Sequence, residues 1–134
     1  MRKALVAYFS ASGVTKRLSE NLAKAIGADL FEIIPEELYT EADLNWKDKN
    51  SRSTVEMKDR ACRPAIASRI DDISQYDVVF VGFPVWWYRE PSIIDTFAES
   101  YYLSREVIGF GKSVDYRRLT VPPDREADKH NVIL

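Results

Sequence analysis

The chain has 134 residues, of which 46% are hydrophobic and 30% are charged, and its formal net charge is −2. This length suits one domain with a real core, the weak charge argues against a nucleic-acid partner, and no apolar run is long enough to cross a bilayer. The single cysteine, Cys62, excludes an intrachain disulfide and a multi-cysteine metal site, and the single histidine, His130, argues against a histidine-based catalytic centre, so we expect no metal. The short apolar stretch at the N-terminus leads straight into patterned structure, which favours a strand over a signal peptide, and we therefore expect a cytoplasmic protein.

The first predicted elements are a strand and a helix. Residues 3 to 9, KALVAYF, form a short run of apolar and β-prone side chains, which is typical of a strand buried on both faces in a parallel sheet. Apolar residues then recur at helical spacing as far as Ile26, charged residues lie on the opposite side, and Gly27 is a plausible stop. This pattern predicts an amphipathic helix. Its apolar positions are Val14, Leu18, Leu22, Ala25 and Ile26.

A second strand is predicted at residues 29 to 35, DLFEIIP, where Pro35 ends it. A long polar and mildly basic stretch follows, as far as about residue 68, and residues 67 to 76 indicate a helix end and a turn. We expect the acidic pair Asp71-Asp72 to lie there, on a solvated helix end.

The strongest strand of the chain is predicted at residues 77 to 85, DVVFVGFPV, because its apolar run is continuous. Residues 92 to 100, SIIDTFAES, then predict a helix that is led by Pro91 and Ser92, with Ile93, Ile94 and Phe97 facing inward. This alternation of strands and helices indicates the α/β class. Beyond it, residues 106 to 110, EVIGF, predict a further strand.

The turn between the first strand and the first helix is a candidate anion site. A helix start presents unpaired backbone N–H groups and the positive end of the helix dipole, which together favour a phosphate. Hydroxyl groups add donors there, and Gly13 lets the backbone approach a ligand closely. The alternative is an ordinary capped helix start, with Ser12 as the N-cap. The residues of the turn are Ser10, Ala11, Ser12, Gly13, Val14 and Thr15.

A second loop, PVWWYREP at residues 84 to 91, follows the strongest strand. Parallel strands end at the same edge of a sheet, so this loop and the first turn are expected to lie near one another. Three adjacent aromatic side chains between prolines suit stacking on a flat ring. The alternative is that one or two of them cap the core or contact a partner. The candidate ring-binding residues are Pro84, Val85, Trp86, Trp87 and Tyr88.

Other nucleotide and catalytic motifs are absent from the sequence. The segment GFGKS ends in Gly-Lys-Ser, but Glu106 stands where a phosphate loop requires glycine. No G-x-G-x-x-G follows the first strand, and the Ser10 turn lacks the glycine of a nucleophile elbow.

The order of strand, Ser-x-Ser-Gly-x-Thr and helix, followed later by VVFVGFPVWWYREP, resembles the flavodoxin family over about residues 1 to 101. More narrowly, it is similar to flavodoxin-like flavoproteins whose second loop reads Pro-Val-Trp-Trp. The resemblance implies a flavodoxin-like three-layer α/β sandwich, with a parallel sheet of order 2-1-3-4-5 and FMN at its carboxyl edge. It also implies that residues 10 to 15 hold the FMN phosphate and residues 84 to 88 lie along the ribityl chain and the isoalloxazine ring.

The C-terminal third departs from this family pattern. Residues 111 to 116, GKSVDY, stand in place of a glycine-rich flavin loop, and no closing helix can be found before the chain ends. We therefore expect a single domain of residues 1 to 134, with a well-matched core to residue 101 and a divergent tail whose strand and helix elements are altered or missing. An uncovered sheet face would expose apolar surface, which predicts a homodimer or a marginally stable fold.

The family resemblance implies that the flavin itself carries the chemistry, so no protein residue is assigned as catalytic. We expect electron transfer to a redox partner protein, or flavin-dependent reduction of small acceptors such as quinones. The weak acidity of the chain slightly favours an oxidoreductase, because electron carriers dock through an acidic rim. The alternative is an apo scaffold or protein-interaction module whose altered C-terminus has abolished flavin binding.

Overall fold

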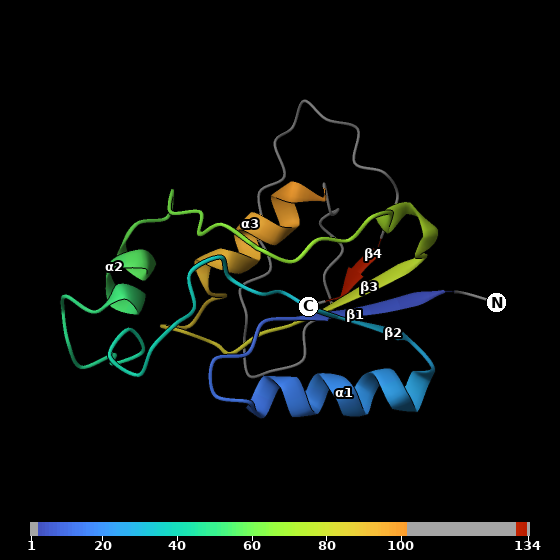
Figure 1. The fold of residues 1–134 in the computed structure, drawn as a ribbon, viewed down its shortest axis with the longest axis horizontal. Coiled ribbons are helices and arrows are strands. Elements are labelled where there is room, and N and C mark those ends of the chain that lie inside the picture. The colour runs from blue at the N-terminus through green and yellow to red at the C-terminus, as the bar shows by residue number, and fades with distance from the viewer. Residues whose placement is uncertain (1–2, 102–130, 134) are drawn as a thin grey trace.

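The computed structural model describes residues 3–101 and 131–133, in which one parallel sheet lies between helices (Figure 1). The strand order is β2-β1-β3-β4, and every neighbouring pair is parallel. This confirms the α/β class and the predicted order 2-1-3. The place beside β3 is taken by β4, while the strand predicted at residues 106 to 110 lies outside the described residues. The strands are β1 (Ala4–Tyr8), β2 (Asp29–Glu32), β3 (Val78–Gly82) and β4 (Asn131–Ile133).

The longer helices lie on opposite faces of the sheet, which gives the predicted three layers (Figure 1). Helix α1 covers one face and α3 the other, while the short α2 lies beyond the carboxyl ends of the strands. None of the helices within the described residues is long and apolar enough to cross a membrane. The helices are α1 (Val14–Ile26), α2 (Arg52–Lys58) and α3 (Ser92–Ser100).

The main core lies between the sheet and α3. Alternate residues of β1 and the residue after it point to this face, because side chains alternate along a strand. Helix α3 follows Pro91 and buries Ile93, Ile94 and Phe97 completely, as its sequence predicts. The core residues from the two strands and the segment after β1 are Leu5, Ala7, Phe9, Val79 and Val81.

Helix α1 has the predicted bounds but not the orientation that its amphipathic pattern indicates. The buried residues are Ser19 and Ala23, whereas Val14 and Leu18 are 74% and 52% exposed. The reason is close packing against β3: a Cβ atom added to Gly82 would lie only 2.8 Å from Ser19 Oγ. Because the helix approaches the strand so closely, small side chains occupy the contact and larger apolar ones turn outward.

The polar stretch contains a helix that the sequence does not predict. Helix α2 begins after Ser51, whose side chain accepts a hydrogen bond from Thr54 N, and an Arg52–Glu56 ion pair of 2.8 Å spans it. The turn predicted at residues 67 to 76 is present as a short 3₁₀ helix, Ile73–Gln75, which Asp72 caps.

Candidate functional site

Two loops leave the carboxyl edge of the sheet side by side. The last residue of β1, Tyr8, pairs with the last residue of β3, Gly82. Beyond this pair, Phe9 N donates a hydrogen bond to Gly82 O at 2.9 Å, and Ile33 N donates to Tyr8 O at 2.7 Å. The turn before α1 and the loop after β3 are therefore neighbours, as the parallel sheet predicts.

The start of α1 is open. Its N-cap is Gly13, with φ +94°, and no side chain caps the helix. The Ser10 hydroxyl instead accepts a hydrogen bond from Gly13 N at 3.1 Å, so the alternative of Ser12 as N-cap is wrong. Because the first N–H groups of a helix lack intrahelical acceptors and no acidic residue stands in this turn, the helix start favours an anion.

The side chains around this helix start leave room for a ligand. Ser12 is exposed, Ser10 and Thr15 are half-buried, and Ala11 packs against the core. Nothing lies within 4 Å of a Cβ atom built on Gly13. Backbone N–H groups, hydroxyl donors and open space thus meet at one place, and these residues fit a phosphate group.

The loop after β3 contains a strained turn, which we call the aromatic turn, Trp86 to Arg89. Trp86 N donates to Arg89 O at 2.9 Å, and Arg89 N donates back to Trp86 O at 3.1 Å. Both central residues have positive φ, +45° at Trp87 and +66° at Tyr88. Such angles suit glycine or asparagine, and for bulky residues each costs about 1–3 kcal/mol.

The strained residues point their aromatic rings into solvent. Tyr88 is 87% exposed and Trp87 is 44% exposed, while Pro84 is half-buried and Val85 lies at the surface. Strained backbone at a loop tip persists only where surrounding structure holds it, and it is concentrated at functional sites. The aromatic turn therefore offers apolar ring surface on the loop whose strand neighbours the one that leads into α1.

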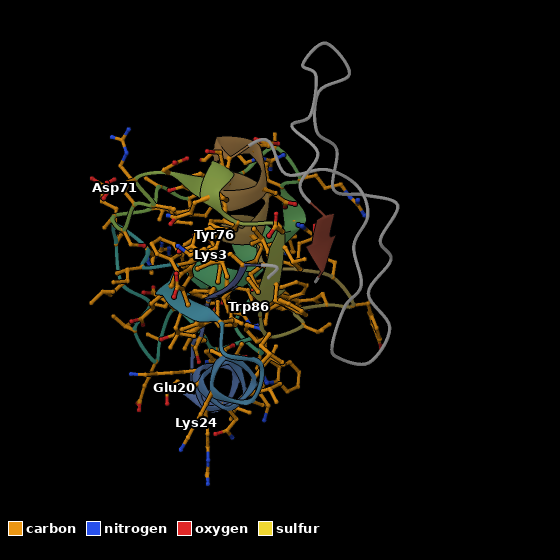
Figure 2. All side chains as sticks on the ribbon, turned by 90° about the vertical axis from the view of Figure 1, so that its right-hand side faces the viewer. Lys3, Glu20, Lys24, Asp71, Tyr76 and Trp86 are labelled. Carbon is orange, nitrogen blue, oxygen red and sulfur yellow. The ribbon has the colours of Figure 1, made fainter. Side chains whose placement is uncertain are left out.

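Trp86 has a different environment from its two neighbours. Its ring is half-buried and lies edge-on to Phe9 and Tyr39, with ring centroids 5.7 Å and 5.6 Å away. Figure 2 shows Trp86 among the side chains that pack around the sheet, whereas Lys24 of α1 points outward. Trp86 thus caps the core, which is the alternative that the sequence left open for one or two of these aromatics.

Tyr39 is a residue of this edge that the sequence does not single out. Its hydroxyl donates to Glu56 Oε2 at 2.6 Å, and the Arg52 guanidinium lies 3.8 Å from the centre of its ring. Burial, together with the bond to Glu56, raises the pKa of Tyr39, so the phenol stays protonated and acts as a donor. A lone tyrosine in a polar stretch carries no local signal. Only its contacts with Phe9 and Trp86 reveal it.

The described residues of this edge include neither a metal-binding cluster nor an activated thiol. In residues 3–101 and 131–133, no three His, Cys, Asp or Glu side chains are placed to hold a metal ion. Burial and the nearby Glu56 and Asp59 raise the pKa of the Cys62 thiol, which lowers its reactivity as a nucleophile. His130 lies outside the described residues.

Sheet order, parallel pairing and a candidate ligand site at the carboxyl edge define a doubly wound α/β protein. The flavodoxin family model matches residues 3–116, so the chain belongs to the flavodoxin family. This match extends past Tyr101, where the resemblance read from the sequence stops. No curated protein matches the chain.

Solved structures from two Bacteroides species resemble this chain over nearly all of its length. A proposed flavoprotein from Bacteroides eggerthii is 41% identical with a TM-score of 0.81, and the match covers 99% of this chain and 87% of that one. A second, from Bacteroides uniformis, is 36% identical with a TM-score of 0.80, covering 98% and 88%. The fold is also shared by a Lactobacillus acidophilus flavoprotein in complex with FMN, at 22% identity and a TM-score of 0.68, covering 99% and 92%.

Proposed function

We propose that the protein binds FMN at the carboxyl edge of its sheet and acts as a flavoprotein. The observation that carries this proposal is the juxtaposition of an uncapped helix start with a strained, exposed aromatic turn. The first suits a phosphate and the second suits a flat ring. FMN carries both groups on one molecule.

The phosphate would lie at residues 10 to 15. The N–H groups at the start of α1 would donate to its oxygens, and the hydroxyls of Ser10, Ser12 and Thr15 would add donors. Ala11 and Val14 would contribute backbone only, since neither side chain can donate a hydrogen bond. No lysine or arginine is required, because the helix dipole supplies the positive potential.

The ring would lie along residues 84 to 88. Trp87 and Tyr88 present the exposed aromatic surface, while Trp86 holds the base of the loop against the core. Pro84 and Val85 lead from the sheet edge to this surface and would line the ribityl chain. The Bacteroides relatives, as proposed flavoproteins, and the FMN complex from Lactobacillus support the proposal.

The reaction we propose is electron transfer to a redox partner protein, or flavin-dependent reduction of small acceptors such as quinones. When bound, the flavin supplies the redox chemistry, and the residues of this chain bind and orient it. Among the described side chains of the two loops, none is a histidine or a reactive thiol, so we assign no acid–base residue there.

A second candidate is a protein-interaction module. The observation that favours it is the exposure of Tyr88 and Trp87, since exposed aromatics also serve as contact residues in protein interfaces. In this case the aromatic turn would bind a protein segment and no flavin.

The deciding experiment is an absorbance spectrum of the purified protein, followed by titration of FMN under fluorescence detection. We expect a yellow protein, or quenching of FMN fluorescence on reconstitution of the colourless one. Trp87→Ala should weaken this binding, while Trp46→Ala, which removes another exposed tryptophan in the polar stretch, should leave it unchanged. A colourless protein that gains no FMN would favour the interaction module.

A further inference from the structure

A buried charged cluster lies directly beneath the aromatic turn. It consists of Arg89, Glu90 and Asp95, whose side chains are 14%, 6% and 11% exposed. Arg89 closes the turn through its backbone, and Asp95 belongs to the first turn of α3. Buried ionic groups are costly unless they are paired, so this cluster calls for a structural reason.

The Arg89 side chain connects three elements. Its Nη2 donates to Met57 O at the end of α2 at 2.9 Å, and its Nη1 lies 3.7 Å from Asp95 Oδ2 and 4.0 Å from Glu90 Oε1. The same residue makes both backbone hydrogen bonds of the aromatic turn. A change around this guanidinium is therefore transmitted to the turn that holds Trp87 and Tyr88 at positive φ.

The two carboxyl groups lie near the same nitrogen of this guanidinium, Nη1. Both carboxyl groups are buried within 4.0 Å of one nitrogen, Arg89 Nη1, so two acidic groups share this guanidinium. Burial, followed by the bond to Glu90 and its charge, raises the pKa of Asp95 to about 8. With that proton in place, the carboxyl group of Asp95 is neutral and adds no second negative charge beside Glu90.

Loss of the proton would place a second buried negative charge beside Glu90, within reach of the two cations Arg63 and Arg89. Arg63 favours the ionised form of Asp95 ahead of Arg89, but it is also held in a two-pronged ion pair with Glu99, at 2.9 and 3.0 Å. The charged groups that act on Asp95 are thus Arg89 and Glu90 from the loop and Arg63 from the segment after α2, and Arg63 is itself paired with Glu99 of α3.

We propose that Arg89 and the Glu90–Asp95 pair form a proton-dependent latch that positions the aromatic turn. The latch is closed while the carboxyl pair holds its proton. In this state Arg89 is fixed, and its backbone hydrogen bonds to Trp86 hold Trp87 and Tyr88 at positive φ. It loosens when the proton leaves to solvent, because the two carboxylates repel one another and redirect Arg89. Arg89 is a positioning residue in this scheme, since it acts through the turn.

The latch does not depend on the proposed function, but its expected effect on FMN affinity does. If the ring lies on Trp87 and Tyr88, the affinity for FMN falls as the pH rises through the range in which the pair loses its proton. The latch itself can be observed without any ligand. The two claims therefore fail separately.

The test is ¹⁹F NMR of the full chain labelled with 5-fluorotryptophan, titrated from about pH 6.5 to 9.5, which spans the expected transition. The chain has three tryptophans, each assigned by its phenylalanine variant. We expect the Trp86 and Trp87 signals to shift together with a midpoint near pH 8, while the Trp46 signal in the polar stretch does not follow.

The discriminating variant is Asp95→Asn, which is isosteric and neutral at every pH. We expect the Trp87 transition to disappear in this variant, whereas Asp71→Asn, a matched change at an exposed position, should retain it. If Asp95→Asn fails to fold, Glu90→Gln provides the same test, because it also removes one charge of the pair. A Trp87 transition that persists in the folded variant, or none in the wild type, would overturn the latch.

A second titration separates the latch from FMN binding. FMN affinity is measured by fluorescence quenching at about pH 7 and pH 9, on either side of the transition. We expect the wild type to lose affinity at the higher pH and Asp95→Asn to lose less. If the ¹⁹F transition is present and the protein binds no FMN at either pH, the latch stands and the proposed function fails.

Discussion

Replacement of Gly13 by aspartate tests the proposed phosphate site most sharply. Gly13 has φ +94°, no side chain caps the helix beside it, and a Cβ atom there would meet open space. Gly13→Asp would place a carboxylate at this point, where it would compete for the free N–H groups and repel the phosphate. At about 5 Å, with an effective dielectric constant of roughly 40 to 80, repulsion of a dianion costs about 2 to 3 kcal/mol. This corresponds to a loss of roughly 30- to 150-fold in FMN affinity.

The assay is a fluorescence titration with FMN and, in parallel, with riboflavin, which lacks the phosphate. We expect Gly13→Asp to weaken FMN binding strongly and riboflavin binding little. Gly27→Asp is the matched control, because Gly27 has φ +67°, also meets open space, and lies at the opposite end of α1. Equal losses for FMN and riboflavin, or an unchanged FMN affinity, would refute the placement of the phosphate.

Four further predictions follow from the same geometry. Tyr88→Gly should raise the free energy of unfolding by about 1 kcal/mol, since φ is +66° there, while weakening FMN binding; a lower melting temperature would contradict this. Gly82→Ala should destabilise the fold by about 1–3 kcal/mol through its contact with Ser19, and Ser19→Ala should rescue it in a double-mutant cycle by denaturant unfolding. Because the pKa of Asp95 is raised in the folded state, the free energy of unfolding should fall between about pH 4 and pH 8, by at most about 1.4 kcal/mol per pH unit. Asp95→Asn should flatten that slope in denaturant titrations, and an unchanged slope would show that other groups cause it. Finally, we propose that the exposed apolar side chains of α1 contact a second copy, so Leu18→Lys should convert a dimeric mass into a monomeric one by light scattering; a monomeric wild type would refute this.

Strands β1, β2 and β3 and the two longer helices could be predicted because their signals are local, whereas β4 (Asn131–Ile133) is not predicted. Continuous apolar runs mark β1 and β3, and Pro91 followed by buried Ile93 and Phe97 marks α3. Helix α2 could not be predicted in this way. Its seven residues have no apolar stripe, and its burial depends on contacts from distant segments, such as Ser92 Oγ donating to Glu56 O.

The orientation of α1 shows why periodicity alone is insufficient. The spacing of Val14, Leu18 and Ile26 predicts the helix correctly, yet Ser19 faces the sheet because Gly82 allows close approach. That contact joins residues far apart in sequence, so no local window contains it.

Some features of the candidate site could likewise be predicted from the sequence, and others could not. The open turn at residues 10 to 15 and the aromatic loop at residues 84 to 88 could be selected from the sequence, and their assignment to FMN stays a prediction. The positive φ angles at Trp87 and Tyr88, and the support of Trp86 by Tyr39, depend on tertiary structure and could not be foreseen.

A crystal structure of the protein grown with FMN tests the central claim most directly. We predict phosphate density within hydrogen-bonding distance of the backbone N–H groups at the start of α1, and the flavin ring against Trp87 or Tyr88. Density for FMN elsewhere, or a helix start closed by its own serine side chains, would contradict the account.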